Sequence, residues 1–365
     1  MSGSIFVHDF SRHAPDCPLE CGAPAAFFDE STMLRIAAAL RRSLRHSIAS
    51  GEDVWTSIVS KHQNFAELLL SGELSAAADI LARMFASPLT YGFEQFDGMY
   101  ERIVADPAVQ QHVRQLAFDR LLSLAASLRA IPVQTVEQGD FLPYLQQHPD
   151  ALLDRIEEKI QQEIHAPHFH GGLFGLKTKR GLFTERSFTA IYVALRLREL
   201  LSPIDDPRIC EIGGGAGYVA YYCNWLGLTN YTIVDLPTVG AVQAYFLAQN
   251  LGADRISLSG ELFCPDRIKV ISAADISALD FDVIVNVDSF PEMSGSTMRG
   301  YLRQSSARYL LSINQEAMAR RSADEFQERV GDVIEEIKGF RRLSRCPFWM
   351  RPGYVEEVYE MRDAP

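Results

Sequence analysis

Arg208-Ile-Cys-Glu-Ile-Gly-Gly-Gly-Ala-Gly-Tyr218 is the segment from which the architecture of this chain can best be inferred. Its composition predicts a short buried strand, then a glycine turn, and then the start of a helix. Glu211 stands near the end of the strand, and Gly213, Gly215 and Gly217 follow it at every second position. Glycines in such a turn let backbone N–H groups approach a ligand where a Cβ atom would collide. The free N–H groups of the next helix's first turn point to the same place, which predicts a binding pocket.

A second carboxylate ends the next apolar segment, Tyr231-Thr-Ile-Val-Asp235. Asp235 is placed to accept hydrogen bonds from two ribose hydroxyls, which favours a cofactor that contains a nucleoside. A dinucleotide fingerprint would need glycine or alanine where the chain has Tyr218, a side chain too large for close helix–strand packing. A glycine-rich turn in some other α/β protein is the alternative, and the order of the later elements argues against it.

Short apolar segments alternate with amphipathic helices from residue 208 onward. We predict strands at 208–212, 231–235, 268–272, 282–287, 308–313, 341–346 and 354–361, and helices at 217–226, 238–250 and 322–337. Such alternation implies an α/β fold with a Rossmann-like, seven-stranded, mainly parallel sheet and helices on both faces. The last two strands have no helix between them, so we expect a hairpin that places an antiparallel strand at or near the sheet edge.

The chain is predicted to have three regions. Residues 1–28 are rich in Pro, Gly and Cys and carry no periodicity, so they are expected to be an irregular arm. Apolar stripes at helical spacing predict that residues 29–180 form an all-helical domain. We expect this domain to lie over the carboxyl edge of the sheet as a substrate-binding lid. Residues 181–365 contain the sheet and form the third region.

A linker with three histidines, His165 to Gly181, leads from the helices into the sheet domain. His168 and His170 are two residues apart, so in an extended segment they would face the same side and could bind a metal or act as a base. A metal site usually needs a third ligand at a firm spacing. We therefore predict no metal and leave the catalytic role of the linker open.

Charge and composition disfavour several classes of partner. Acidic residues outnumber basic ones, 47 against 35, for a formal net charge of −12, which disfavours a nucleic-acid backbone or an anionic membrane. No apolar run is long enough to span a bilayer, and the N-terminal residues do not read as a signal peptide. The six cysteines show no paired metal-binding spacing and fit a reducing compartment. We expect a cytoplasmic protein, for which a homodimer remains open.

The acid-x-G-x-G-x-G pattern resembles motif I of the class I S-adenosylmethionine-dependent methyltransferases. The resemblance implies that the chain binds S-adenosylmethionine. It implies that Glu211 lies near the methionine part of the cofactor and that Gly213, Gly215 and Gly217 pass close to its sugar and amino acid. Asp235 would then hold the ribose, and the sheet domain would be the cofactor-binding methyltransferase domain.

Two further cofactor contacts are expected. Arg186 would pair its fork-shaped guanidinium with the carboxylate of S-adenosylmethionine. In this family an acid after the third strand often meets the adenine amino group. Two segments resemble that strand, one followed by Glu261 and the other by Asp275. We favour Asp275, whose segment runs straight into the next strand, and keep Glu261 as the alternative.

The segment Asn286-Val-Asp-Ser-Phe-Pro-Glu-Met293 follows the fourth strand. It should face the transferred methyl group, because ligands of open α/β sheets bind beyond the carboxyl ends of the strands. Its Asn-x-x-Ser-Phe-x-Glu-Met pattern resembles a signature of bacterial sugar O-methyltransferases, as do Lys179–Arg186 and Tyr309–Asn314. The resemblance covers about 175–365. It implies methyl transfer to a hydroxyl of a sugar or a glycosylated small metabolite.

Two carboxylates of this segment are candidates for the base that removes the hydroxyl proton. Glu292 is the first and Asp288 the second, since shielding from water raises the pKa of a carboxylate. The structural alternatives are a helix N-terminal acid for Glu292 and a turn residue for Asp288. Asn286 is assigned to the cofactor. The segment lacks the Asp/Asn-Pro-Pro-aromatic motif and the Pro-Cys nucleophile of enzymes that methylate nucleic-acid bases, so base methylation is disfavoured.

Other functions remain open at the level of sequence. An O- or N-methyltransferase of a peptide or natural product would share every cofactor residue. A non-catalytic protein that binds S-adenosylmethionine or a nucleotide would bind its ligand and form no methylated product. An NAD-dependent dehydrogenase would bind NAD in place of S-adenosylmethionine.

Overall fold

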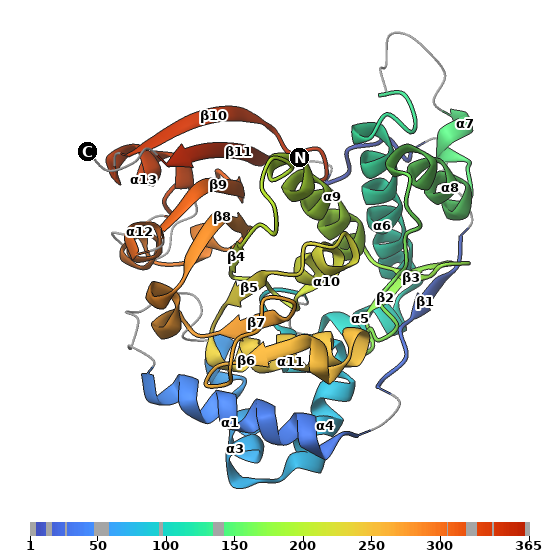
Figure 1. The fold of residues 1–365 in the computed structure, drawn as a ribbon. Helices are drawn as coiled ribbons and strands as arrows, with labels where there is room; N and C mark the ends of the chain where they lie inside the picture. Colours follow the sequence, from blue (N-terminus) through green and yellow to red (C-terminus); the bar gives the residue numbers. More distant parts are fainter. Residues whose placement is uncertain are drawn as a thin grey trace.

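A mainly parallel sheet lies at the centre of the protein (Figure 1). The computed structural model describes residues 5–11, 17–25, 28–46, 58–94, 98–133, 142–304, 306–318, 327–337 and 339–361. Within these residues, eight strands form the sheet. In spatial order they are β10 (Phe340–Pro347), β11 (Tyr354–Met361), β9 (Ser306–Gln315), β8 (Asp280–Val287), β4 (Ile209–Ile212), β5 (Tyr231–Val234), β7 (Ile268–Ile271) and β6 (Ile256–Leu258).

The predicted α/β architecture is confirmed, with one correction in the number of strands. Strand β11 pairs antiparallel with both β9 and β10, so the expected hairpin lies at one edge of the sheet. The prediction of seven strands is wrong because both segments that resemble the third strand are strands. Strand β6 adds to the outer edge of β7 in parallel register, where its buried Ile256 and Leu258 extend the core.

Alternate residues of the inner strands enter two separate cores on the two faces of the sheet. In β8, Val283 and Val285 join one core and Ile284 joins the other. The first core is covered by α9 (Glu185–Leu200), α10 (Tyr218–Trp225) and α11 (Pro237–Leu251), and the second by α12 (Gly295–Gln304) and α13 (Val330–Ile337). Helices therefore cover both faces, as predicted. Of the predicted helix 322–337, residues 330–337 form α13, residues 327–329 are not helical, and residues 322–326 lie outside the described residues.

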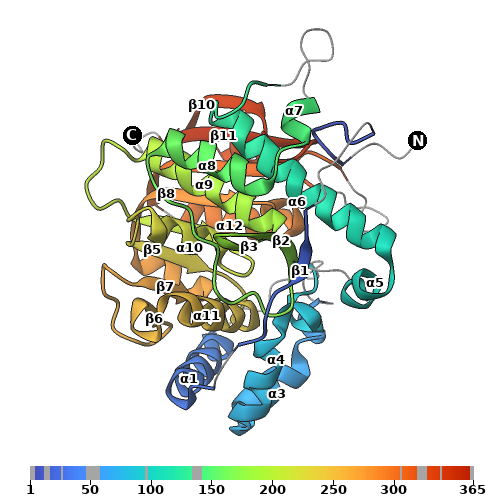
Figure 2. The ribbon, with the colours of Figure 1, turned by 90° about the vertical axis from the view of Figure 1, so that its right-hand side faces the viewer.

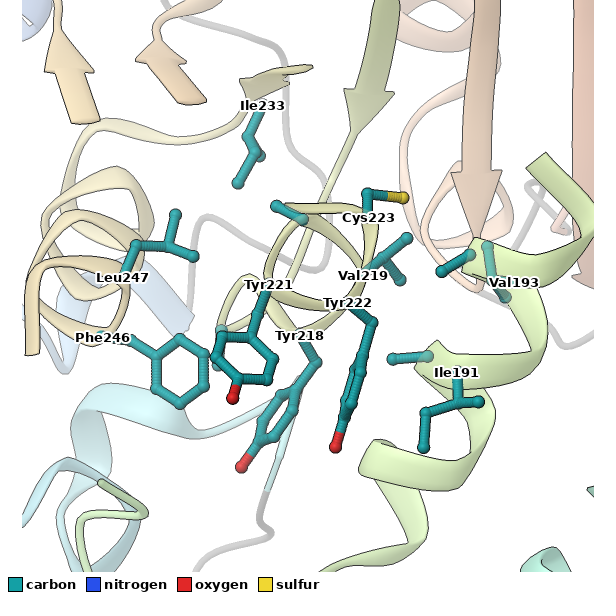
Figure 3. Close-up of a cluster of buried hydrophobic side chains, with 14 of the residues drawn as sticks. Ile191, Val193, Tyr218, Val219, Tyr221, Tyr222, Cys223, Ile233, Phe246 and Leu247 are labelled. Atoms are coloured by element: carbon teal, nitrogen blue, oxygen red, sulfur yellow. The ribbon is translucent and has the colours of Figure 1, made fainter. Parts of the chain in front are cut away.

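Helix α10, which follows the glycine turn, is buried on nearly all sides between α9 and α11 (Figure 3). Tyr222 is fully buried and points toward Ile191 of α9, whereas Tyr218 and Tyr221 point toward Phe246 of α11. The ring centroids of Tyr218 and Phe246 lie 4.8 Å apart. This packing holds the start of α10, and with it the glycine turn, in a single position.

The N-terminal half adds helices around the sheet domain and shares its hydrophobic core. Figure 2 shows α1 beside α11 and α6 alongside α9, and α3 and α4 pack against α1. These helices are α1 (Glu30–His46), α3 (Gln63–Ser71), α4 (Leu74–Ala82), α5 (Met99–Ala105), α6 (Pro107–Ser127), α7 (Leu142–Leu145) and α8 (Pro149–Ile160). Short 3-10 turns cover Met84–Ala86 and Pro88–Thr90. None of the helices in the described part of the chain is long and apolar enough to cross a bilayer.

A small antiparallel sheet corrects the prediction that residues 29–180 are all helical. It consists of β1 (Leu19–Cys21), β2 (Phe174–Thr178) and β3 (Gly181–Phe183). Strand β1 comes from the predicted irregular arm and pairs with a segment more than 150 positions away, a contact that local patterns do not reveal. The predicted domain boundary at 180/181 falls in the turn of the β2–β3 hairpin, and the division into separate domains stays a prediction.

Replacing Thr184 by alanine should destabilise the protein by about 1 kcal/mol, the usual cost of removing an N-cap side chain. Thr184 Oγ1 accepts a hydrogen bond from the N–H of Ser187, and Ser187 Oγ accepts one from the N–H of Thr184, at 3.2 Å each. Urea denaturation measures the loss. Because the two bonds form one capping box, the double variant Thr184→Ala/Ser187→Ala should cost less than the sum of the single variants; strict additivity would contradict this account.

Candidate functional site

A cavity of about 790 Å³ lies at the carboxyl ends of the central strands. The chain segments that follow β4, β5, β7 and β8 line it, and Phe93 and Glu94 of the N-terminal half line it as well. Its volume falls in the usual range of small-molecule sites, about 300–1,000 Å³. A cavity therefore lies at the edge of the sheet where the sequence predicts a binding site, and residues of the N-terminal half form part of its wall.

The glycine turn forms one wall of this cavity in a backbone conformation that favours glycine. Gly213 and Gly215 have φ angles of +73° and +55°, and both line the cavity. A Cβ atom on Gly213 would lie 2.3 Å from Ser289 Oγ, which is far inside contact distance. Gly217, with φ +94°, is the residue that precedes α10 and does not line the cavity. Two of the three predicted glycines therefore reach the site directly.

Glu211 lies beneath the turn with its side chain almost completely buried. Its Oε2 atom has no hydrogen-bond partner among the described residues, and the oxygen would lie 2.8 Å from a Cβ placed on Gly214. Burial raises the pKa of Glu211 to about 8, an effect larger than the opposite influence of the Tyr231 hydroxyl. A buried carboxylate with an unused oxygen is suited to a cationic or hydrogen-bond-donating ligand.

Asp235 follows β5 and lines the cavity next to the glycine turn. Its Oδ1 accepts a hydrogen bond from the N–H of Leu236 at 2.8 Å, and its Oδ2 accepts one from Gln243 Nε2 at 2.6 Å. Gln243 Nε2 also donates to the carbonyl of Gly215 at 3.0 Å. Burial raises the pKa of Asp235 to about 7. Gln243, which the sequence analysis missed, thus ties the ribose-binding candidate to the glycine turn.

Arg186 and Glu94 face each other at the cavity wall. Arg186 Nε lies 3.7 Å from Glu94 Oε2 and 3.6 Å from Glu185 Oε1, and it makes no close hydrogen bond among the described residues. Burial acts to lower the pKa of Arg186, but the carboxylates of Glu185, Glu94 and Asp288 outweigh it and raise the pKa. The guanidinium is therefore charged and available to a ligand carboxylate.

The two candidate bases both line the cavity, in different surroundings. Asp288 has a φ of +57°, and its two oxygens accept hydrogen bonds from Tyr354 Oη at 2.7 Å and Arg351 Nη1 at 2.9 Å. Glu292 is half-buried in the 3-10 turn Phe290–Glu292 that leads toward α12. Asp288 is held in place by two donors, which the sequence did not reveal because both lie more than 60 positions away.

Three other predicted residues do not line the cavity. Asn286 is fully buried and donates to the carbonyl of Ile212 at 2.9 Å, so it braces the end of β4. Asp275 accepts a hydrogen bond from Ser259 Oγ at 3.0 Å, and Glu261 pairs with Arg35 Nε at 2.7 Å. The wall after β7 consists of residues 272–274 instead. The cofactor contacts assigned to Asn286 and Asp275 stay predictions.

The linker histidines His168 and His170 differ in solvent exposure. His168 is exposed, whereas His170 is buried with its Nδ1 3.4 Å from Tyr218 Oη. Burial lowers the pKa of His170 to about 4. Within the residues that the structure describes, no group of three or more His, Cys, Asp and Glu residues is arranged to hold a metal ion.

Comparisons with known proteins place methyltransferases among the solved structures similar to this chain. A scan against protein-family models and a search of curated proteins each found no match. The glycopeptide N-methyltransferase MtfA complexed with S-adenosylmethionine is 17% identical, with 47% of this chain and 94% of that chain covered and a TM-score of 0.35. A SAM-dependent methyltransferase from Aquifex aeolicus is 16% identical, with coverage of 49% and 98% and a TM-score of 0.31.

The 16S rRNA methyltransferase RmtF in complex with S-adenosyl-L-homocysteine matches over 92% of this chain and 100% of its own, at 13% identity and a TM-score of 0.36. All three proteins are methyltransferases, and two of them are complexed with S-adenosylmethionine or S-adenosylhomocysteine. At these identities and TM-scores the likenesses assign neither an activity nor a substrate to this chain.

Proposed function

We propose that this protein is a methyltransferase that uses S-adenosylmethionine as its methyl donor. The observation that carries the proposal is the position of two carboxylates. Glu211 lies in β4 and Asp235 directly follows the neighbouring parallel strand β5, and both line the cavity beside the glycine turn. A nucleoside with two ribose hydroxyls and a cationic tail offers the complementary hydrogen-bond donors and charge. The strand order with its terminal hairpin supports the same proposal, because it is the layout expected of a class I methyltransferase.

The residues at the cavity fit this cofactor group by group. Asp235 would accept the ribose hydroxyls through the lone pairs that Leu236 and Gln243 leave free. Arg186 would pair with the cofactor carboxylate, for which its guanidinium has the matching fork geometry. Glu211 Oε2 lacks a partner among the described residues and would accept from the cationic tail.

The chain's own chemical task is positioning and proton removal. When bound, S-adenosylmethionine supplies an electrophilic methyl group on its sulfonium. The cavity walls would hold a substrate hydroxyl in line with that group, and a carboxylate would take the hydroxyl proton. Glu94, Asp288 and Glu292 all line the cavity, and such polar groups can engage the hydroxyls of a sugar or glycosylated small metabolite. The sequence pattern of 286–293 supports the same substrate class.

Cofactor binding near pH 7 should release protons from the protein. The pKa of Glu211 is raised to about 8 and that of Asp235 to about 7, so both carboxylates are partly protonated in the empty cavity. A ligand that donates hydrogen bonds or carries positive charge favours their ionised forms and expels the protons. Calorimetry of S-adenosylhomocysteine binding in two buffers of different ionisation enthalpy measures the release. Asp235→Asn should reduce it, and an identical heat in both buffers would contradict the prediction.

The proposed activity is tested by incubating the protein with methyl-labelled S-adenosylmethionine and a panel of methyl glycosides, nucleotide sugars, peptides, RNA and cell extract. Mass spectrometry of the labelled species then identifies the methylated class. Transfer to a sugar hydroxyl is the expected result. Binding of S-adenosylmethionine without any labelled product would favour a non-catalytic binding protein, and binding of NAD alone would favour a dehydrogenase.

A further inference from the structure

Glu94, a buried carboxylate of the N-terminal half, lines the cavity, and one of its oxygens has no hydrogen-bond partner among the described residues. Its side chain is only 4% exposed, and its Oε2 atom accepts no hydrogen bond from the described residues. Arg186 Nε is 3.7 Å away, too far for a close hydrogen bond. Leaving a buried acceptor unsatisfied is costly, so its presence at a cavity wall indicates a ligand group that supplies the missing donor.

Glu94 lies near the part of the cavity wall that follows β8. Glu94 and Asp288 both line the cavity, and both carboxylates, against the effect of burial, raise the pKa of Arg186, so they lie near the same guanidinium. Burial and the Asp235 carboxylate raise the pKa of Tyr301, which places α12 beside the nucleoside position. Glu94 is therefore close to the segment that the sequence analysis expects to face the transferred methyl group.

The neighbouring carboxylates are less suited to take a proton. Both oxygens of Asp288 already accept hydrogen bonds, from Tyr354 and Arg351, which stabilise its charged form. Glu292 lies on the segment that leads into α12 and is half-buried. Glu94 combines deeper burial with an unused oxygen.

We propose that Glu94 is the general base that removes the proton from the substrate hydroxyl, an inference that rests on the proposed methyltransferase function. The substrate oxygen bonds to the methyl carbon, the methyl carbon–sulfur bond breaks with its electron pair on sulfur, and the hydroxyl proton passes to the Glu94 carboxylate. The products are the methyl ether, S-adenosylhomocysteine and a protonated Glu94. Once Arg186 pairs with the cofactor carboxylate, Glu94 is free to face the substrate.

The surroundings of Glu94 suit this role at neutral pH. Burial raises its pKa to about 7, while Arg186 acts to lower the pKa and Glu185 to raise it. Tyr218 lines the same cavity, and burial raises the pKa of its hydroxyl well above the usual value, so it stays neutral. A base whose pKa lies near the working pH is partly ionised and still basic enough to accept a proton.

The test compares Glu94→Gln with Glu185→Gln, a carboxylate that also neighbours Arg186 but does not line the cavity. Label transfer from S-adenosylmethionine to the methyl glycoside and nucleotide-sugar panel gives kcat, and calorimetry gives the Kd of S-adenosylhomocysteine. Glu94→Gln should lower kcat at least about 100-fold, the usual contribution of a general base, with Kd within about threefold of the wild-type value. Glu185→Gln should change neither quantity by more than about threefold.

The pH profile distinguishes a base from a structural residue. The wild-type kcat should fall below about pH 7 as Glu94 becomes protonated, and Glu94→Gln should lose this limb, whereas Glu94→Asp should keep it with reduced kcat. Full turnover of Glu94→Gln, or an equal loss confined to Glu292→Gln, would overturn the assignment while leaving the methyltransferase proposal intact. A wild-type protein that transfers no label, or that does not bind S-adenosylhomocysteine, would overturn both.

Discussion

Gly213→Ala should lose S-adenosylhomocysteine binding and should destabilise the protein by about 2–6 kcal/mol, the sum of an unfavourable φ and an overpacked contact. The backbone of Gly213 has a φ of +73°, which alanine adopts only with strain. The added Cβ would lie 2.3 Å from Ser289 Oγ and 2.6 Å from Ser289 Cβ. To relieve this overlap, either the glycine turn or the loop after β8 must move, and both line the cavity.

Urea denaturation and calorimetry measure the two effects of Gly213→Ala separately. The matched control is Gly240→Ala in α11, where the added Cβ meets Val270 at an ordinary 3.5 Å; this change should be neutral or stabilising by up to about 1 kcal/mol. Ser289→Gly in the Gly213→Ala background should recover part of the stability, because it removes the atoms that clash. A Gly213→Ala protein with unchanged stability and affinity would show that the turn does not approach Ser289 as described.

Asp235→Ala should weaken S-adenosylmethionine binding by at least about 100-fold. Hydrogen bonds to a charged group contribute about 1.5–3 kcal/mol each, and the proposed ribose contact includes two. Alanine also removes the hydrogen bonds that Leu236 and Gln243 donate to Asp235, so urea denaturation is used to check that the variant is folded. Because the folded-state pKa of Asp235 is raised to about 7, its ionisation disfavours the folded state as the pH rises toward that value, and alanine removes this cost.

Calorimetric titration at pH 8 checks the Asp235 prediction. Asp332→Ala, which removes an exposed carboxylate of α13, serves as the control for a general loss of negative charge and should bind normally. Gln243→Leu should give an intermediate loss, since it removes the donor that orients Asp235 and holds Gly215 without removing the carboxylate itself. An unchanged affinity in Asp235→Ala would mean that the nucleoside does not lie at the end of β5.

Agreement between sequence and structure is best where the signal is local. The strand–glycine–helix segment 208–218 and the following Asp235 depend on short-range patterns, and the structure brings them together at one cavity. The extra strand β6 was missed because two apolar segments were treated as alternatives when the sheet edge accommodates both. The β1–β2 pairing was missed because strand partners far apart in the chain leave no periodic pattern.

The amino-acid sequence alone determined the α/β class, the terminal hairpin, and the glycines and acids that line the cavity, Glu211, Gly213, Gly215 and Asp235, because steric freedom at glycine and apolar alternation along strands are properties of neighbouring residues. Only the tertiary structure decided which carboxylates remain without partners. Asp288 is taken up by Arg351 and Tyr354, whereas Glu94 is buried opposite Arg186 with an oxygen unused by the described residues. The charge state and hydrogen-bonding capacity of a side chain depend on groups that the fold brings from distant parts of the chain, so they could be read only after those groups had been placed.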